Sequence, residues 1–390
     1  MVTKQELENR LASFIAALGG DWDTAFIVNR INQYYFTGTI QDGLLVVKKN
    51  GQSAFFVRRS YERARLESPL ENIYPMRSYR DAAALIGSSC GVTYLDTETA
   101  TIGLLERMKK HFDMSDILPV EGIITGVRAI KSPTELALME QVGKLHHQFL
   151  AEEVPNLLRE GMTETEFTAL AYKKMLELGH HGVTRFNMYQ NETVCGQMGF
   201  GVNALYPTNF DGSGGMLGLC PAAPAIGNRE TTLKKGDIVF VDYAFGMEGY
   251  HTDKTVVYSF GAPPPEAAVA AHRQCMDIQN RIAAMLKPGN TPAGIYTDIM
   301  DSLDEDFKQG FPGFGNKEVA FLGHGIGLHI DEAPALAKGF NEPLAENMVF
   351  AVEPKKGIEG IGLLGAEDTY VVTPSGGRCI TGTTCGILTV

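Results

Sequence analysis

The chain has 390 residues, of which 44% are hydrophobic and 21% are charged, and its formal net charge is −12. This composition is ordinary for a globular protein, and at roughly 100–200 residues per domain the length predicts two domains. The acidic charge argues against a nucleic acid or an anionic membrane as partner. The apolar stretches are strand-length, far short of the roughly 20 residues that a membrane-spanning helix needs.

Six cysteines are scattered along the chain without a C-x-x-C pair. A chain of this size with few, dispersed cysteines is typical of a reducing compartment. The first residues, MVTKQELENRLASF, lack the apolar segment of a secretory signal. We therefore expect a cytoplasmic protein with free thiols.

Residues 1–124 form the first predicted domain, which is of the α/β class. Short apolar runs separated by polar turns indicate a mixed sheet. The predicted helices are residues 4–18 and 60–67, and the predicted strands are residues 24–29, 43–48, 53–57 and 91–95. This part of the sequence holds no dense cluster of His and carboxylate residues, so we assign it no chemistry of its own.

Residues 125–390 form the second predicted domain, which opens on a clear helix signal. Ser132-Pro133-Thr134-Glu135 combines an N-cap serine, a proline at the first helical position and a glutamate three residues after the cap. The predicted helices are residues 132–158, 163–178, 267–286 and 292–311. Residues 180–230 are rich in Gly, Pro, Asn and aromatic residues, and a long irregular segment of this kind is more often functional than filler.

Five possible metal ligands lie at or beside the strands predicted for the second domain. Those strands are residues 237–243, 255–260, 318–322, 348–353, 361–364 and 368–372. The candidates are Asp242 in GDIVFVDYAFG, Asp253 in GYHTDKT, His324 in GHGIGLHIDEAP, Glu353 in FAVEPKKG and Glu367 in GAEDTYVVT. Any one of them alone is more simply read as a turn, edge-strand or solvated side chain.

The five candidates are more informative together. Asp242 ends the apolar run IVFVD, where burying an unpaired charge is costly and a bound cation removes that cost. A hairpin between Asp242 and Asp253 would aim both carboxylates at one point. Four carboxylates and one imidazole suit two divalent ions with an activated water between them, and the nitrogen ligand favours Mn, Co, Fe or Zn over Ca or Mg.

With these motifs, the chain resembles the creatinase/prolidase/methionine aminopeptidase superfamily of "pita-bread" metallopeptidases, and most of all the Xaa-Pro dipeptidase and aminopeptidase type. The resemblance rests on VRAIKSPTELALME, LKPGNT and the five ligand contexts in order, with NQYYFTG and VRRSYERAR in the first domain. It implies two carboxylate-bridged metal ions, with Asp242 and Asp253 on one side, His324 on the other and Glu367 bridging. It also implies that Glu353 binds metal and takes the proton of the attacking water, and that the protein is a homodimer.

Three positions depart from the family pattern. The second histidine that usually follows the metal histidine by seven residues is replaced by Asp331, although His329 lies two residues earlier and either residue can serve as a catalytic group. No histidine occurs between His181 and His251, where family members often carry one. The D-x-T-R-T motif reads DKTVV, which lacks the arginine.

The leading hypothesis is a dinuclear metallopeptidase that cleaves the first bond of short Xaa-Pro peptides. A second hypothesis, motivated by the missing histidines, is an enzyme of the same fold that acts on a small amide. A binding protein without catalysis ranks last, because such a protein has no need to keep five ligands.

Overall fold

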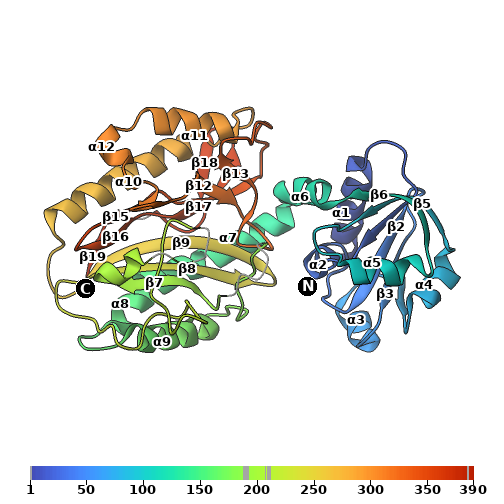
Figure 1. Cartoon of the computed structure of the whole chain (residues 1–390), viewed down its shortest axis with the longest axis horizontal. Coiled ribbons are helices and arrows are strands. Elements are labelled where there is room, and N and C mark those ends of the chain that lie inside the picture. Colours follow the sequence, from blue (N-terminus) through green and yellow to red (C-terminus); the bar gives the residue numbers. More distant parts are fainter. Residues whose placement is uncertain (1, 188–192, 207, 209–211, 384–385) are drawn as a thin grey trace. The chain divides into compact units, whose positions relative to one another are not determined.

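The computed structural model describes residues 2–187, 193–206, 208, 212–383 and 386–390 (Figure 1). Its contacts divide the chain into two compact units, Met1–Arg128 and Ala129–Val390. The predicted boundary after residue 124 lies inside helix α6 (Glu121–Ala129), which closes the first unit. None of the helices in the described parts combines the length and apolarity of a membrane span.

The first unit is built on one six-stranded mixed sheet in the order β4-β3-β2-β1-β5-β6. Its strands are β1 (Thr24–Ile27), β2 (Gly43–Lys48), β3 (Ser53–Val57), β4 (Ile73–Pro75), β5 (Ser89–Leu95) and β6 (Asp113–Pro119). Its helices before α6 are α1 (Lys4–Ala17), α2 (Arg30–Thr37), α3 (Tyr61–Glu67), α4 (Tyr79–Ile86) and α5 (Ile102–Lys109). Fully buried aromatic rings such as Phe26, Phe56 and Phe112 fill its core. The α/β class predicted for this unit is confirmed.

The second unit consists of helices around three small sheets. Its helices are α7 (Pro133–Gln148), α8 (Val154–Leu157), α9 (Glu164–Glu177), α10 (Glu266–Met285), α11 (Pro292–Asp301) and α12 (Glu305–Lys308). Its strands are β7 (Gly196–Phe200), β8 (Ile238–Met247), β9 (Tyr250–Ser259), β10 (Gly313–Phe314), β11 (Lys317–Glu318), β12 (Phe321–Gly325), β13 (Glu332–Ala337), β14 (Val349–Val352), β15 (Lys355–Ile358), β16 (Gly362–Gly365), β17 (Asp368–Thr373), β18 (Gly376–Cys379) and β19 (Leu388–Thr389). The sheets have the orders β19-β9-β8-β7, β13-β12-β14-β17-β18 and β11-β10-β15-β16.

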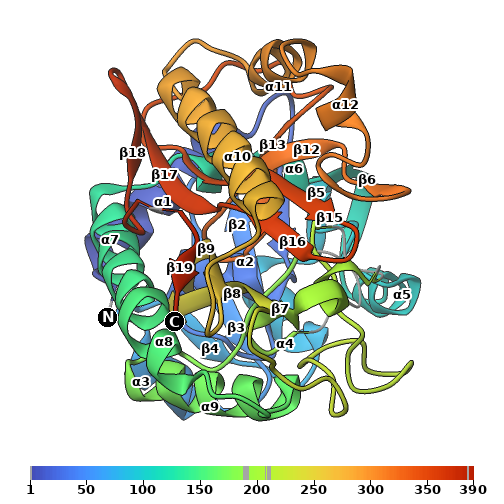
Figure 2. The ribbon, with the colours of Figure 1, turned by 90° about the vertical axis from the view of Figure 1, so that its left-hand side faces the viewer.

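The strands of the second unit lie between two groups of helices (Figures 1 and 2). Helix α7 packs on β8 and β9, whereas α10 packs on β14, β15, β16 and β18. One apolar core lies between α7, α9 and strands β7 to β9, and another lies between α10, α11 and strands β12, β14 and β17. The space between these cores is therefore enclosed by strands, and it holds the polar residues described below.

Two of the predicted helices of the second unit are not single regular α-helices. The predicted helix 132–158 has the expected capping box at Ser132, but its helical path includes a π-helical segment, Phe149–Glu153, before α8. Pro155 lacks the N–H that a regular α-helical turn requires, which accounts for the wider turn before it. The predicted helix 292–311 is interrupted after Asp301. Ser302 is the C-cap of α11, and Asp304 is the N-cap of α12.

Candidate metal centre

The hairpin β8–β9 carries the first two predicted ligands. The strands pair Asp242 with Thr255 and Ala244 with Asp253. Directly paired residues share a face of a sheet, as do residues two apart on one strand, so both aspartates point to the same side. The strands are longer than predicted and turn at Glu248 and Gly249, which both have positive φ, so Asp253 lies within β9 rather than before it.

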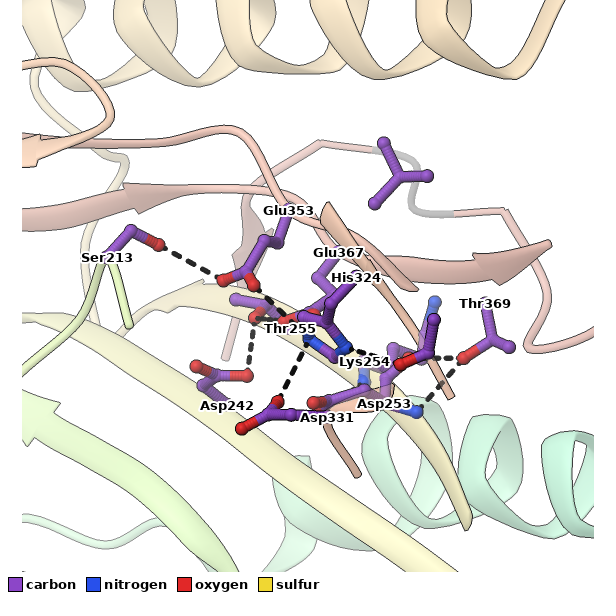
Figure 3. Close-up of polar contacts among 12 residues, drawn as sticks. Ser213, Asp242, Asp253, Lys254, Thr255, His324, Asp331, Glu353, Glu367 and Thr369 are labelled. Carbon is purple, nitrogen blue, oxygen red and sulfur yellow. Dashed lines mark hydrogen bonds and ion pairs between the residues drawn. The ribbon is translucent and has the colours of Figure 1, made fainter. Parts of the chain in front are cut away.

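The other three predicted ligands come from neighbouring strands of the next sheet. His324 is in β12, which pairs with β14, and Glu353 follows the last residue of β14. Val352 pairs with Asp368 at the start of β17, so Glu353 and Glu367 extend from adjoining strand ends. The amide of Thr255 donates to the carbonyl of Glu367 over 3.2 Å, which joins this sheet to the β8–β9 hairpin. The fold thus gathers all five predicted ligands into one cluster (Figure 3).

His324 lies at one end of this cluster. Its Nε2 atom is 3.3 Å from Glu353 Oε1, 3.6 Å from Asp331 Oδ1 and 3.9 Å from Glu367 Oε1. Asp253, His324 and Glu367 each offer a ligand atom within 4.8 Å of the other two. Glu367 Oε1 is buried and has no hydrogen-bond partner among the described residues. A buried carboxylate oxygen without a partner is costly, and a cation at this point would satisfy it.

A residue that was not predicted, Lys355, lies in the middle of the cluster. Its side-chain Nζ atom donates to Asp242 Oδ2 at 2.8 Å, Glu353 Oε2 at 2.9 Å and Glu367 Oε2 at 2.7 Å. The residue is 1% exposed. An ammonium group has three N–H donors, so these three carboxylates satisfy it fully.

The sequence contains a signal for Lys355. Glu353 and Lys355 are two residues apart in the extended segment EPKKG, and residues two apart in an extended segment point to the same side. Two adjacent lysines near a glycine are usually solvated, so the sequence alone does not distinguish Lys355 as a buried residue. The neighbouring Lys356 lies away from the cluster and donates to the backbone carbonyls of Phe307 and Gln309.

Hydroxyl groups complete the hydrogen bonding of the cluster. Thr255 Oγ1 is 2.9 Å from Asp242 Oδ1 and 3.0 Å from Glu367 Oε2, and it donates its one hydrogen to either carboxylate. Ser213 Oγ donates to Glu353 Oε2 over 3.2 Å. Thr369 Oγ1 accepts from the amide of Asp253 and donates to its carbonyl (Figure 3). Thr255 and Ser213 therefore hold carboxylates of the cluster, whereas Thr369 holds the backbone of Asp253.

Burial and the neighbouring charges shift the pKa values of the cluster in opposite directions. Burial opposes the charge of His324, but Asp331 and Glu353 outweigh it and raise the pKa of His324 to about 10. Burial also opposes the charge of Glu353, yet Lys355 and then His324 lower its pKa to about 2. Burial, followed by the repulsion of neighbouring carboxylates, raises the pKa of Asp253 and of Glu367 well above the usual range. A cation bound at His324 must displace a proton, so its binding weakens as the pH falls.

The two candidates for the missing histidine are placed differently. Asp331 lines a small pocket beside His324, together with Asp242, Asp253 and Glu353. His329 is buried and does not line that pocket, and its amide donates to Glu332 Oε1 over 3.0 Å. The pocket has a volume of about 30 Å³, which suits an ion or a water rather than a whole peptide.

The residues of the cluster fit one divalent cation directly. Asp253, His324 and the unsatisfied oxygen of Glu367 supply one nitrogen and two carboxylate ligands, a set that Mn, Co, Fe and Zn all accept. The position expected for a second ion is different, because the ammonium of Lys355 lies against the carboxylates that would hold it.

Comparison with known families agrees with this geometry. The model of metallopeptidase family M24 matches residues 137–374, and that of the creatinase/prolidase N-terminal domain matches residues 9–130. The two matches follow the order of the two units, and they confirm the resemblance found in the sequence.

Individual relatives match along most of the chain. An Xaa-Pro dipeptidase of Pyrococcus furiosus is 23% identical over 373 residues, which cover 93% of this chain and 94% of that protein. A probable dipeptidase, PepE, of Mycobacterium bovis is 28% identical over 270 residues, which cover 68% of this chain and 62% of that protein. Among solved structures, the prolidase of Pyrococcus horikoshii has a TM-score of 0.78 at 20% identity, covering 96% of this chain and 98% of that one. The pita-bread fold predicted for the second unit is thereby confirmed.

Proposed function

Because the chain belongs to metallopeptidase family M24, we propose that it is a metal-dependent peptidase that cleaves the N-terminal bond of short Xaa-Pro peptides. The observation that carries this proposal is the convergence of Asp253, His324 and Glu367, where the buried Oε1 atom of Glu367 has no hydrogen-bond partner among the described residues. The dipeptidase names of several relatives support the substrate class.

A divalent ion held by Asp253, His324 and Glu367 would lower the pKa of a water and polarise a carbonyl, which is the chemistry that peptide hydrolysis needs. The residues of the chain supply the remaining functions. Oε1 of Glu353 lies 3.3 Å from His324 Nε2, and Oε2 of Glu353 accepts hydrogen bonds from Lys355 and Ser213. Lys355 keeps this carboxylate ionised, and we propose that the ionised carboxylate accepts the proton of the attacking water.

We propose that a substrate contacts residues that line the pocket. Asp331 lies at its edge, 3.6 Å from His324 Nε2, where a family peptidase would carry a histidine. We propose that Asp331 orients the His324 ring and faces the substrate amine. His329 remains the second candidate, although its ring does not line the pocket. We further propose Mn, Co, Zn or Fe as the metal, the cytoplasm as the location and a homodimer as the assembly.

Hydrolysis of a panel of Xaa-Pro dipeptides and tripeptides, with added Mn, Co or Zn, tests the proposal. Glu353→Gln is the matched control, because the amide keeps an oxygen that accepts from Lys355 while it loses the ability to take a proton. Removing a general base typically costs about 10²- to 10⁴-fold in rate, so we expect metal-dependent cleavage that is lost in this variant while circular dichroism stays unchanged. Full activity of Glu353→Gln would contradict the role of Glu353.

The same panel distinguishes the second candidate function, hydrolysis of a small amide. The carboxylate of Asp331, which stands where family peptidases carry a histidine, motivates this second candidate. If no Xaa-Pro peptide is cleaved while metal is demonstrably bound, the peptide assignment is wrong and small non-peptide amides are the next substrates to test.

A further inference from the structure

Lys355 is held in the centre of the cluster by its position in the fold. It is the first residue of β15, and β15 pairs with β16 so that Lys355 lies opposite Gly365. A Cβ atom on Gly365 would lie 2.4 Å from the carbonyl oxygen of Pro354 and 2.7 Å from Cα of Lys355. The glycine thus permits a close approach of the two strands, and this approach brings Lys355 and Glu367 to the same point.

The cluster contains two adjoining cation positions that share Glu367. At the first position, Lys355 Nζ donates to Oε2 of Glu367 and also to the carboxylates of Asp242 and Glu353. At the second position, Oε1 of Glu367 faces His324 and Asp253 and has no hydrogen-bond partner among the described residues. One position therefore already contains a positive charge, and the other has the ligands for one.

A divalent ion cannot share the first position with the ammonium. Carboxylate oxygens bind such an ion at about 2.0–2.2 Å, and the same three carboxylates lie 2.7–2.9 Å from Lys355 Nζ. An ion among them would lie in contact with the ammonium, and two like charges a few ångströms apart repel strongly in a buried site. The ammonium has no easy exit, since the residue is 1% exposed and all three of its N–H groups are bonded.

We propose that this centre binds one divalent cation, between Asp253, His324 and Glu367, and that the ammonium of Lys355 fills the position of the second. This inference rests on the proposed function in one respect, namely that the centre binds a divalent cation at all. The site then combines a divalent charge with a single fixed one, and Lys355 acts as a positioning residue for the carboxylates of Asp242 and Glu353.

The number of bound ions tests the inference without reference to activity. The full chain is saturated with Mn²⁺ or Zn²⁺, freed from unbound ion by gel filtration, and measured by elemental analysis and by native mass spectrometry. We expect one ion per chain in the wild type. Lys355→Ala removes the ammonium and leaves space among the three carboxylates, so we expect this variant to bind two ions per chain, a twofold increase.

Lys356→Ala is the matched control, because its side chain lies on the carbonyls of Phe307 and Gln309 rather than in the cluster. We expect it to bind one ion. Lys355→Ser, which leaves similar space and adds a hydroxyl, replaces Lys355→Ala if that variant does not fold. The wild-type count decides the number of ions even if neither variant folds.

The outcomes separate this inference from the proposed function. Two ions in the wild type would overturn the inference and leave the proposed function standing. One ion in both the wild type and the Lys355 variants would overturn the assignment of the second position to Lys355, as would two ions in Lys356→Ala. No ion in the wild type would overturn the proposed function, and the inference with it.

Discussion

Among the described residues of the second unit, the buried lysines Lys254 and Lys355 each lie close in sequence to a predicted metal ligand, and their surroundings differ. Lys254 follows Asp253, and its Nζ atom pairs with Asp368 and donates to the carbonyl of Gly382. Lys355 lies two residues after Glu353, and its Nζ atom donates to three carboxylates. Both residues are 1% exposed.

The difference lies in the balance of charge. At Lys254, Thr381 also donates to Asp368, so the ion pair is enclosed by hydrogen-bond partners. At Lys355, one positive charge faces several carboxylates, and Glu367 Oε1 remains without a hydrogen-bond partner among the described residues. The matched pair already has its partners, whereas the carboxylates around Lys355 outnumber its ammonium and leave a buried oxygen that a further cation would satisfy.

Breaking the ion pair between Lys254 and Asp368 should have the largest effect on stability. Lys254→Met leaves Asp368 buried without its partner, which typically costs about 3–5 kcal/mol. We expect a loss of this size in the free energy of unfolding by urea, unchanged by added Mn²⁺. The double variant Lys254→Met/Asp368→Asn should recover part of it. A loss below about 1 kcal/mol, or recovery on addition of Mn²⁺, would remove the contrast between the two lysines.

Removing the side chain of Lys355 should lower the stability of the fold by an amount that added metal largely restores. Without metal, Lys355→Ala leaves three carboxylates without their shared ammonium, so we expect destabilisation of about 3 kcal/mol. An additional ion at 100 times its Kd returns about 2.7 kcal/mol. Thermal unfolding with and without Mn²⁺ measures both quantities. An equal gain from Mn²⁺ in Lys355→Ala and in the wild type would contradict the account.

Substitution of Asp331 should lower the catalytic efficiency more than substitution of His329 does. Asp331 lines the pocket and lies 3.6 Å from His324 Nε2, whereas His329 lies outside the pocket lining. We expect Asp331→Ala to lower kcat/KM about tenfold, which corresponds to about 1.4 kcal/mol in the barrier, and His329→Ala to change it less. The reverse order would make His329 the substitute for the missing histidine.

The sequence predicts which five side chains converge better than it predicts what surrounds them. Asp242 and Asp253 are predicted as a pair because an apolar strand followed by a turn is a local pattern. The predicted hairpin turns at Glu248 and Gly249, but its second strand is predicted too short, because the polar segment HTD interrupts the apolar pattern although His251 and Thr252 are buried in β9. Buried polar residues in strands depend on partners from other sheets, and such partners cannot be read from local sequence.

Lys355 shows the same limit at the site. Its spacing from Glu353 is visible in the sequence, but its pairing with Asp242, 113 residues away, follows only from the fold. In the first unit, the same limit applies to an entire helix. Helix α2 has its N-cap at Asn29, a residue placed at the end of a strand by its apolar neighbours, so the helix is absent from the prediction. Part of the irregular segment 180–230 lies outside the described residues.

Anomalous diffraction from crystals soaked in Mn²⁺ locates the bound ions and shows whether Lys355 takes the place of one of them. We expect one anomalous peak per chain, between Asp253, His324 and Glu367, with Lys355 Nζ still within hydrogen-bond distance of Asp242. Two peaks, with the side chain of Lys355 displaced from the cluster, would contradict it.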